Sequence, residues 1–271
     1  MNTAEALTQD IQTGVYADIS NEAYHTGPGI SKSQLDDFNI CPARYRYGER
    51  KDTAALTFGA ATHCAVLEPN EFEKRYMNGG TTRRGTKAWA ALEEDGREII
   101  KEDEWTKALK IRDRVHAHPV ANKLLANIVA EQSAYWTDEE TGLLCRCRPD
   151  AWSKVLRALI DLKSTVSAKP NEFAKSIWNY RYHVQDAFYT DGWHQALGEQ
   201  IDGFVFIAVE KEAPFVTECF ELERPHAQKG RDTYRRNLAD LKACIDSNTW
   251  NGYTDGSINT ISLPAWTDNY E

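Results

Sequence analysis

One apolar segment that ends in an acid and a lysine constrains this chain more than any other feature. Residues 155–160 read Val-Leu-Arg-Ala-Leu-Ile and are followed directly by Asp161, Leu162 and Lys163. Aliphatic and β-branched residues in such a run predict a buried strand. Because side chains alternate across a strand, Asp161 and Lys163 project from one face and Leu162 from the other. A carboxylate and an amine are costly to bury unless they are paired or used, so this strand predicts a functional site.

A second acid, Asp150, lies near the end of the preceding predicted strand, which begins at Leu143. Two carboxylates supply the hard oxygen ligands that Mg²⁺ prefers, and a nearby lysine can orient or help to deprotonate an attacking water. The set therefore matches the requirements of Mg²⁺-dependent phosphodiester cleavage. Taken alone, an Asp-x-Lys pair is more often a surface ion pair than a catalytic pair. The context of the pair, not the tripeptide, favours the catalytic interpretation.

His63 lies in a predicted helix of small and apolar residues, 53–67, which ends before Pro69. A lone histidine on an apolar helix is more often a core residue than a ligand, although imidazole is a common metal ligand. Both interpretations of His63 stay open from the residues alone.

Length and hydropathy restrict the class of protein. The chain has 271 residues, of which 41% are hydrophobic and 27% charged, as in an ordinary globular protein with a substantial core. Its apolar runs are all shorter than the ~20 residues of a membrane span, and its start lacks the pattern of a signal peptide. We therefore expect a cytoplasmic protein that makes no membrane contact. The six cysteines include no CxxC pair, so free thiols in a reducing compartment are expected.

The net charge of −9 does not favour a nucleic-acid ligand, but its distribution weakens the objection. Four acids and no Lys or Arg precede Lys32, and four more acids, again without Lys or Arg, occur from Asp246 onward. The part between holds 33 acids against 32 bases. Basic residues cluster there in three places, which permit DNA binding without arguing for it: Arg44, Arg46, Arg50 and Lys51; Arg83, Arg84 and Lys87; and Arg231, Arg235 and Arg236.

The periodicity predicts an α+β protein with three parts: an irregular arm over 1–28, one domain over 29–247 and a tail over 248–271. Within the domain, 29–129 is mainly helical, and 130–247 holds a central sheet with flanking helices. Residues 77–87 are expected to form a flexible basic loop, and Ser31-Lys-Ser-Gln34 has the form of a capping box. Helices are expected at 31–38, 42–47, 53–67, 86–94, 102–117, 120–129, 170–179, 182–197 and 224–245, and strands, the first three as an antiparallel meander, at 131–137, 143–152, 155–163, 204–210 and 215–222.

Five short motifs in this order resemble those of the PD-(D/E)xK nucleases, in particular the RecB-like branch. They are a Ser-rich, Cys-Pro segment over 29–47, Gly-x-x-x-His over Gly59–His63, Arg-Pro-Asp at 148–150, acid-x-Lys at 161–163 and Gln-x-x-x-Tyr over 185–189. The longer run over about 24–245 is most similar to the RecE-type nuclease domains (exonuclease VIII). The resemblance implies a restriction-endonuclease-like core, with a mixed central sheet flanked by helices and an N-terminal helical region.

The resemblance also implies roles for individual residues. His63, Asp150, Asp161 and the main-chain carbonyl of Leu162 would ligate Mg²⁺ or Mn²⁺, since a histidine in the shell tolerates Mn²⁺ as well. Glu131 is the acid best placed to reach a second metal, and its alternative is a solvated carboxylate. Lys163 would polarise the attacking water, Gln185 would orient Lys163 or the nucleophile, and Tyr189 would contact a DNA phosphate or brace Gln185. A helix that merely packs its polar edge on the sheet is the alternative for Gln185 and Tyr189.

For the whole protein, the resemblance implies 5′-to-3′ exonuclease digestion of one strand from double-stranded DNA ends. The 3′ single strand would serve homologous recombination through a RecT-type annealing protein, and a ring-shaped homotetramer would provide processivity. The alternatives are a Cas4-like or endonucleolytic PD-(D/E)xK nuclease and a DNA-end-binding module without catalysis. An iron–sulfur cluster is not expected, because only Cys219 and Cys244 follow the predicted core, and Cys41 is expected to be a packing residue.

Overall fold

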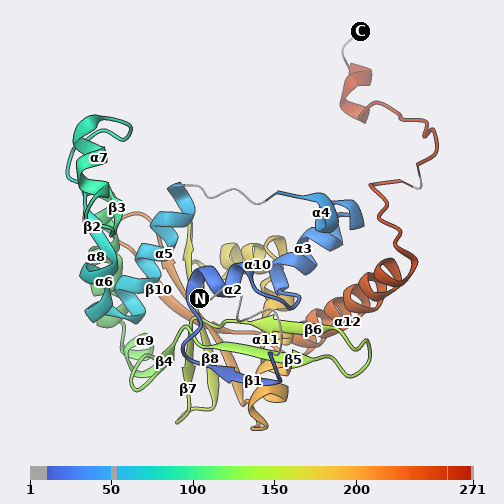
Figure 1. Cartoon of the computed structure of the whole chain (residues 1–271), viewed down its shortest axis with the longest axis horizontal. Helices are drawn as coiled ribbons and strands as arrows, with labels where there is room; N and C mark the ends of the chain where they lie inside the picture. The colour runs from blue at the N-terminus through green and yellow to red at the C-terminus, as the bar shows by residue number, and fades with distance from the viewer. Residues whose placement is uncertain (1–10, 50–53, 255, 270–271) are drawn as a thin grey trace.

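A mixed five-stranded sheet lies at the centre of the protein (Figure 1). The computed structural model describes residues 11–49, 54–254 and 256–269. The strand order is β10-β9-β8-β7-β4. β8 and β9 are parallel and the other pairs are antiparallel. The bounds are β4 (Val129–Ala130), β7 (Ala151–Ser153), β8 (Ala158–Thr165), β9 (Gly203–Glu210) and β10 (Thr217–Glu221). The predicted α+β class with a mixed sheet and flanking helices is confirmed.

A second, three-stranded sheet has the order β1-β5-β6, with β1 at Gly14–Tyr16, β5 at Ser133–Thr137 and β6 at Leu144–Cys147. The prediction of one strand over 143–152 in a single meander is wrong, because β6 pairs with β5 whereas β7 pairs with β8. Pro149 lies between the two strands and has no N–H to donate to a ladder. The chain changes sheets there, and Asp150 is therefore at a strand start.

The observed strand β8 also begins later than the predicted strand over 155–163. Val155 is 78% exposed and belongs to a turn in which Arg157 has φ +47°, so β8 starts only at Ala158. Apolar residues in a tight turn imitate the start of a strand. The eight residues of β8 then pair with β9 along their whole length, which places Asp161 and Lys163 in the middle of the sheet.

The N-terminal segment, predicted as an irregular arm, contains β1 and α2 (Asn21–Thr26). Arg146 in β6 fixes this segment, because its guanidinium donates to the carbonyl oxygens of His25, Gly27 and Pro28. Ile30 then bridges to Cys145. The buried arginine needs hydrogen-bond acceptors, and the main-chain carbonyls of this segment provide them. The segment is therefore fixed although it has few apolar residues, and a hydropathy pattern does not reveal such a contact.

The helices agree more closely with the sequence. The predicted bounds of α8, α10 and α11 are confirmed, and α3 begins with the predicted capping box between Ser31 and Gln34. α9 is shorter than predicted, because β4 begins at Val129, and the short parallel pair β2 and β3 was not predicted. The remaining bounds are α3 (Lys32–Ile40), α4 (Pro42–Tyr47), α5 (Ala54–Leu67), α6 (Pro69–Arg75), β2 (Tyr76–Asn78), α7 (Lys87–Glu93), β3 (Glu98–Ile100), α8 (Glu102–Ala117), α9 (Pro119–Leu124), α10 (Pro170–Asn179), α11 (Tyr182–Leu197), α12 (Arg224–Ser247) and the 3₁₀ helix η1 (Ala265–Asn269).

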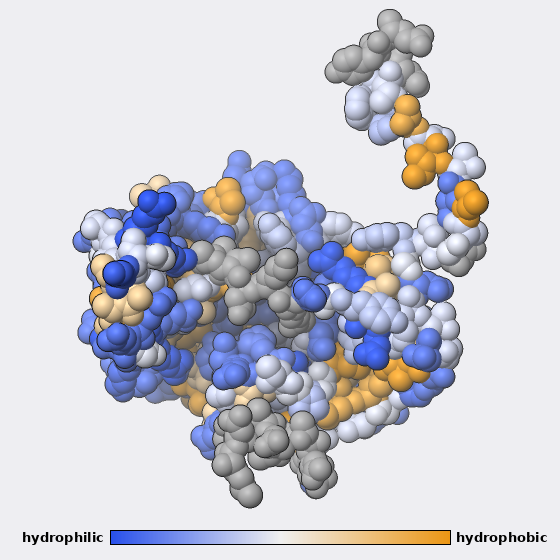
Figure 2. Space-filling model, turned by 45° about the horizontal axis from the view of Figure 1, so that its top comes forward, coloured by the Kyte–Doolittle hydropathy of each residue, from blue (hydrophilic) through white to orange (hydrophobic). Residues whose placement is uncertain are grey.

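The helices form two groups on either side of α10. In Figure 1, α6, α7 and α8 with β2 and β3 form one lobe, and α3, α4 and α12 lie on the opposite side. Beyond α12 the chain extends away from the body as a tail. Figure 2 shows apolar residues along this tail on an otherwise largely hydrophilic face, and Ile258, Ile261 and Leu263 are strongly exposed. None of the helices in the described part of the chain has the length and apolarity that crossing a bilayer requires.

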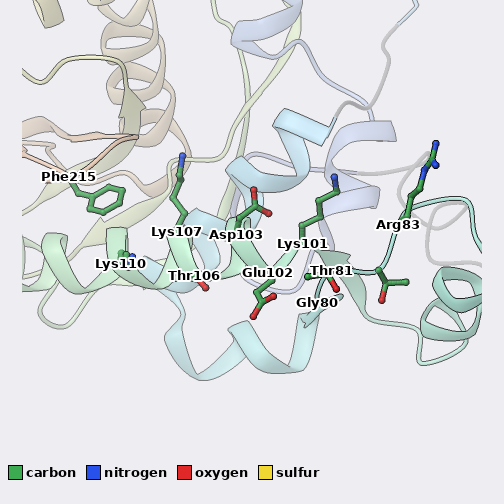
Figure 3. Close-up of a pocket in the computed structure, with 11 residues that line it drawn as sticks. Gly80, Thr81, Arg83, Lys101, Glu102, Asp103, Thr106, Lys107, Lys110 and Phe215 are labelled. Atoms are coloured by element: carbon green, nitrogen blue, oxygen red, sulfur yellow. The ribbon is translucent and has the colours of Figure 1, made fainter.

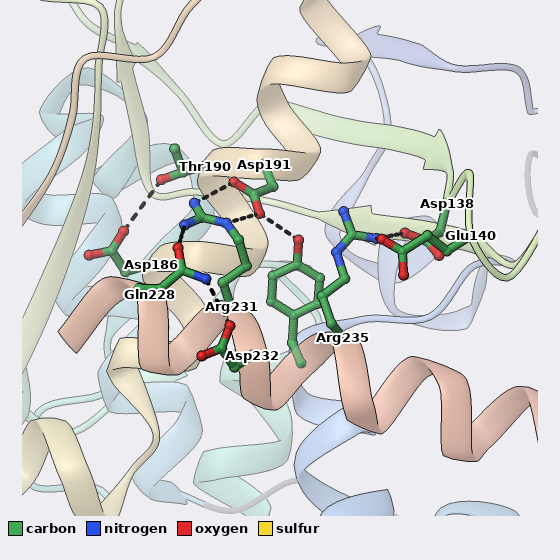
Figure 4. A network of polar contacts seen from close by, with 10 residues as sticks. Asp138, Glu140, Asp186, Thr190, Asp191, Gln228, Arg231, Asp232 and Arg235 are labelled. Atoms are coloured by element: carbon green, nitrogen blue, oxygen red, sulfur yellow. Dashed lines mark hydrogen bonds and ion pairs between the residues drawn. The ribbon is translucent and has the colours of Figure 1, made fainter. Parts of the chain in front are cut away.

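Close packing of α11 on α12 completes the main core. A Cβ at Gly230 would lie 1.9 Å from the carbonyl oxygen of His183, so only glycine fits there. A polar network around α12 includes Arg231 with Asp191 of α11 (2.6 Å) and Arg235 with Asp138, which directly follows β5 (Figure 4). These two arginines of the basic cluster on α12 therefore neutralise acids inside the protein and do not form a phosphate track.

Candidate metal centre and active site

Three side chains that could ligate a metal ion converge from separate elements. His63 comes from α5, Glu131 follows β4 directly, and Asp150 directly precedes β7. One ligand atom from each residue lies within 4.8 Å of the others, and His63 Nδ1 is 3.3 Å from Asp150 Oδ2. The side chains of His63 and Asp150 are 27% and 15% exposed, so His63 borders solvent and is not enclosed in the core. The group is thus partly open to an incoming ion.

The end of a strand ladder positions Asp150. Pairing between β7 and β8 stops at Ala151 and Ile160. Beyond that point the N–H of Leu162 donates to Asp150 Oδ2 at 2.6 Å, and the N–H of Glu131 donates to the Asp150 carbonyl at 3.1 Å. Glu131 has φ +54°, a strained value for a residue with a side chain. Three main-chain segments are therefore fixed around one carboxylate.

Asp161 and Lys163 form a buried ion pair beside this group. The distance from Lys163 Nζ to Asp161 Oδ2 is 2.5 Å, and the side chain of Lys163 is 17% exposed and that of Asp161 2%. The Gln185 amide donates to Asp161 Oδ1. Lys163 Nζ also lies 4.5 Å from the centre of the Tyr182 ring. Both oxygens of Asp161 thus have partners, and the lysine is held between a carboxylate and an aromatic face.

The crowding of charges shifts the pKa of most groups in the site. Burial raises the pKa of Glu131 to about 7, with a further contribution from Asp150, and burial raises that of Asp161 to about 6 against the effect of Lys163. Burial works to lower the pKa of His63, but Asp150 and the other carboxylates outweigh it and raise the pKa to about 9. Burial opposes ionisation of Asp150 too, yet His63, Lys163 and the Leu162 N–H keep its pKa below the ordinary value. The site without metal therefore favours an ionised Asp150 beside a protonated His63.

The residues fit a divalent cation. An imidazole and two carboxylates, close together and partly accessible, form a mixed nitrogen and oxygen set that suits Mg²⁺ or Mn²⁺. A positive ion would also relieve the repulsion that raises the pKa of Glu131. Asp161 is adjacent through Leu162, but its oxygens are occupied by Lys163 and Gln185. Among the described residues, Glu131 rather than Asp161 completes the three-residue group, and ligation by Asp161 and by the Leu162 carbonyl stays a prediction.

The structure places Gln185 and Tyr189 on one face of α11. Gln185 contacts Asp161 rather than Lys163. The half-buried Tyr189 ring packs edge-on against Phe204, at 6.3 Å between ring centres. Burial raises the pKa of Tyr189 above its ordinary value, with smaller contributions from acidic groups that include Asp161 and Asp150. Tyr189 is therefore a neutral phenol near the carboxylates, and contact with a DNA phosphate stays a prediction.

Sequence reasoning missed residues that support the site from the side of α3. Lys32 Nζ pairs with Asp36 (2.7 Å) and donates to the carbonyl of Tyr180 (2.8 Å). Arg181 pairs with the same Asp36 at 2.8 Å. The one available signal was a lysine in the first turn of a helix, where acids are favoured. Arg148 was quoted only as part of a motif, yet its guanidinium lies 4.4 Å from the centre of the Tyr24 ring and joins the N-terminal segment to the site.

A separate hollow of about 790 Å³ lies at the beginning of α8 (Figure 3). Its lining includes the predicted basic loop and one aromatic residue from the β9–β10 connection, with four cations and two acids: Arg83, Lys101, Lys107 and Lys110, and Glu102 and Asp103. Lys107 pairs with Glu212 at 2.7 Å. The aromatic residue is Phe215, and the N–H of Lys211 in the same connection donates to Thr165 at the end of β8. The hollow is thus on the side of the sheet edge where the strand that carries Lys163 ends.

Comparison with known proteins identifies the family. A family model described as "PDDEXK-like domain of unknown function (DUF3799)" matches residues 31–262. The chain belongs to this family. Among solved structures, a "Putative exonuclease" from Eubacterium rectale has a TM-score of 0.62 at 13% identity, covering 92% of this chain and 97% of the other. A second structure, a protein from Vibrio cholerae, has 13% identity over 88% of this chain and 62% of the other, but its TM-score of 0.21 carries no argument. No curated protein matches the sequence.

These findings establish the PDDEXK-like class. The resemblance to PD-(D/E)xK nucleases that the motifs predicted is confirmed at the level of the superfamily. At 13% identity, the Eubacterium rectale structure supports the fold alone. The candidate metal group of His63, Glu131 and Asp150 and the acid-x-Lys pair thus lie in a PDDEXK-like domain.

Metal binding by the DUF3799 site is expected to strengthen as the pH rises from 7 to 9. A metal-bound imidazole must be neutral, whereas the pKa of His63 without metal is about 9, so each bound ion displaces a proton from His63. The affinity for Mn²⁺ should rise by up to about tenfold per pH unit in this window. Titration calorimetry at pH 7, 8 and 9 measures the slope. The pKa of Glu131, about 7, confines its contribution to the lower end of this range.

The variant His63→Ala tests the assignment of that proton. Its Mn²⁺ affinity should be lower and nearly independent of pH between 7.5 and 9, and its Mg²⁺ requirement for cleavage should be raised. A variant that only melts at lower temperature, with the wild-type pH slope, would identify His63 as a packing residue.

Proposed function

We propose that this DUF3799 protein is a Mg²⁺- or Mn²⁺-dependent nuclease that hydrolyses phosphodiester bonds of DNA. The observation that carries the proposal is the convergence of His63, Glu131 and Asp150 beside the buried Asp161–Lys163 pair. These groups come from distant parts of the chain. The site contains a strained main-chain conformation at Glu131 and a buried carboxylate at Asp161. Such an arrangement is costly unless it has a function.

Each residue has a role that follows from its surroundings. His63, Glu131 and Asp150 would hold the cation, which when bound would stabilise charge on the scissile phosphate and the leaving oxygen. Lys163 would orient the attacking water, because its ammonium group is fixed by Asp161 and the Tyr182 ring. Gln185 fixes Asp161 from the other side and thereby sets the position of the lysine.

The more specific form of the proposal is 5′-to-3′ digestion of one strand from a duplex end. It rests on the similarity of the run over 24–245 to the RecE-type domains, which also implies a ring-shaped homotetramer and a RecT-type annealing partner. The cation-rich hollow at α8 is a surface on which a phosphate backbone could lie, despite the net charge of −9. A threaded ring would allow an acidic protein to work on DNA, since topology would replace part of the electrostatic affinity.

End-labelled duplexes test both levels of the proposal. Linear duplex carrying a 5′ or a 3′ label is incubated with Mg²⁺, with Mn²⁺ or with EDTA. Early release of the 5′ label as a mononucleotide is expected only with metal. Early release of the 3′ label would refute the polarity, and nicking of closed circles would favour the endonuclease alternative. A band shift without loss of label in either metal would support a DNA-end-binding module and overturn the enzymatic proposal.

Gly59 gives a prediction that separates stability from activity. It lies in α5 one turn before His63, and a Cβ there would meet no described heavy atom within 4 Å. Glycine inside a helix costs about 1 kcal/mol relative to alanine. Gly59→Ala should therefore raise the melting temperature by about 2–4 °C. If DNA approaches this face closely, the same variant should raise the KM for duplex.

The matched comparison is Gly230→Ala, which should be destabilised, because its Cβ would overlap the main chain at His183. Thermal melts and initial cleavage rates at several duplex concentrations measure both effects. An unchanged KM in a stabilised Gly59→Ala protein would rule out close approach of the substrate at this position.

A further inference from the structure

An exposed group of rings marks the corner between α10 and α11. This aromatic corner consists of Trp178, Tyr180, Tyr182 and His183. Trp178 and Tyr180 are 58% and 63% exposed, although large aromatic side chains usually bury most of their surface. The Trp178 ring stacks on His183 with 5.1 Å between ring centres and a 9° angle, and Tyr180 stacks on Tyr182 at 5.6 Å and 28°. Each exposed ring therefore has a stacked partner and still presents more than half of its surface to solvent.

The aromatic corner is continuous with the reacting centre. Lys163 Nζ pairs with Asp161 at 2.5 Å and lies 4.5 Å from the centre of the Tyr182 ring. Tyr182 in turn stacks on Tyr180. An unbroken series of contacts thus leads from the acid-x-Lys pair to an aromatic ring at the surface.

Two elements, α3 and α12, hold the corner in place. Arg181 has φ +56°, an unfavourable value for a residue with a side chain. Its guanidinium is fixed by Asp36 of α3 (2.8 Å) and by Asn237 of α12 (2.7 Å). Lys32 of α3 donates to the carbonyl of Tyr180 at 2.8 Å. Strain that is offset by contacts from two helices indicates a preorganised surface rather than an accidental bulge.

The charges next to the rings favour a nucleic-acid ligand. Lys229 Nζ lies 4.8 Å from the centre of the Trp178 ring, and Lys32 and Lys163 both lie near the Tyr182 ring. Surfaces that bind single-stranded nucleic acid combine aromatic rings, on which bases stack, with cations that contact the phosphates. Lysine is depleted at protein–protein interfaces, so the lysines beside these rings favour an anionic strand over a protein partner.

We propose that the aromatic corner is a stacking platform for the unpaired bases of one DNA strand beside the cleavage site. The proposal rests on the proposed nuclease function and adds to it a preference for an unpaired strand next to Lys163. Trp178 and Tyr180 would each stack a base, and Lys229 would contact the intervening backbone. Duplex DNA keeps its bases inside and could not use these rings until its end had opened.

The test compares two oligonucleotides of equal length and charge. Fluorescein-labelled oligo-dT and an abasic oligomer with the same phosphates are titrated with the full chain, with Ca²⁺ as the metal. Wild-type protein should bind oligo-dT more tightly. Removing one stacking ring costs about 5- to 150-fold in affinity for a strand with bases. Trp178→Ala/Tyr180→Ala should therefore lose most of its preference for oligo-dT over the abasic oligomer.

Two further variants control the result. Trp178→Phe/Tyr180→Phe keeps the rings and should retain most of the preference. Tyr253→Ala removes an 80% exposed tyrosine from the tail and should bind as the wild type does. A double alanine variant that folds and keeps the full preference for oligo-dT would overturn the platform. So would a change in self-association, measured by light scattering, with unchanged oligonucleotide binding, because it would assign the rings to a protein contact.

The outcome is distinguishable from failure of the proposed function. Wild-type protein that neither cleaves duplex with Mg²⁺ or Mn²⁺ nor binds either oligomer would overturn the nuclease proposal itself. Wild-type protein that cleaves duplex but binds the two oligomers equally would overturn the platform alone.

Discussion

Replacing Lys163 by glutamine is expected to lower the rate of Mg²⁺-dependent cleavage of linear duplex by about 10²- to 10⁴-fold, the range for loss of a positioned proton-transfer group. The ammonium group of Lys163 is 2.5 Å from Asp161 and is directed by the Tyr182 ring, so a water that it orients has a fixed place. Glutamine preserves a donor for the buried Asp161 carboxylate, which alanine would leave without its partner at a large cost in stability. Loss of activity in Lys163→Gln would therefore report on chemistry rather than on folding.

The matched control for this variant is Lys154→Gln. Lys154 is exposed in the turn after β7, on the same sheet. The Lys154→Gln variant should therefore cleave at the wild-type rate. Single-turnover rates with saturating protein separate the chemical step from DNA binding, and thermal melts check the fold. Should Lys163→Gln cleave within a few-fold of the wild type, the acid-x-Lys assignment would be lost, and the pair would be a structural ion pair.

The parts of the fold that sequence predicted well are those fixed by local periodicity. The bounds of α8 follow from an amphipathic pattern, the start of α10 follows from Pro170 at a first helical turn, and the capping box at Ser31 depends on residues three apart. Strand pairing depends on distant residues, so the division of 143–152 between two sheets was not foreseen. Pro149 was visible in the sequence, but a proline marks a break without telling which sheet follows it.

The candidate site shows the same division. His63, Asp150, Asp161 and Lys163 were chosen from motifs, and the structure brings them together. The order of importance was not predictable: Glu131, the weakest assignment, completes the group with His63 and Asp150, whereas Asp161 is held by Lys163 and Gln185. That order depends on the φ of +54° at Glu131 and on where a ladder ends. The supporting contacts of Lys32 and Arg181 join residues that are about 150 positions apart in the sequence. No sequence spacing predicts such contacts.

The acids around Asp150 make metal binding and stability interdependent. Glu131, Asp150 and Asp161 are close enough for burial and mutual repulsion to raise the pKa of Glu131 and Asp161. A bound cation relieves this repulsion and binds only the folded state, so it should stabilise the protein. The gain is about 2.7 kcal/mol when the free metal is 100 times its dissociation constant.

Asp150→Asn is expected to abolish this stabilisation and to lower cleavage by at least about 100-fold, since even the outer partners of metal ligands contribute 10- to 100-fold. Asparagine has the same shape and can still accept the hydrogen bond from the Leu162 N–H, which is 2.6 Å in the native protein. The charge that attracts the ion is gone, and His63 loses the carboxylate that raises its pKa. Melting in EDTA should occur at a modestly lower temperature than in the wild type, because the variant loses the attraction of Asp150 to His63 and Lys163, and the relieved repulsion among the acids offsets only part of that loss. Addition of Mg²⁺, Mn²⁺ or Ca²⁺ should raise the melting temperature of the wild type but not of the variant.

Asp202→Asn is the control, because Asp202 pairs with Arg157 at the surface, away from the site, and its metal response should be that of the wild type. A metal-induced rise that persists in Asp150→Asn would move the cation away from His63 and Glu131, and the mechanism would then lack its electrostatic centre. The expected result is a metal-induced rise of the melting temperature in the wild type, which EDTA removes and each added metal restores. If Asp150→Asn shows no such rise with any of the metals, the ion is bound at this carboxylate. The difference between the two melting curves therefore tests the metal centre without relying on catalysis, and it remains informative if the true substrate is a nucleic acid other than linear duplex.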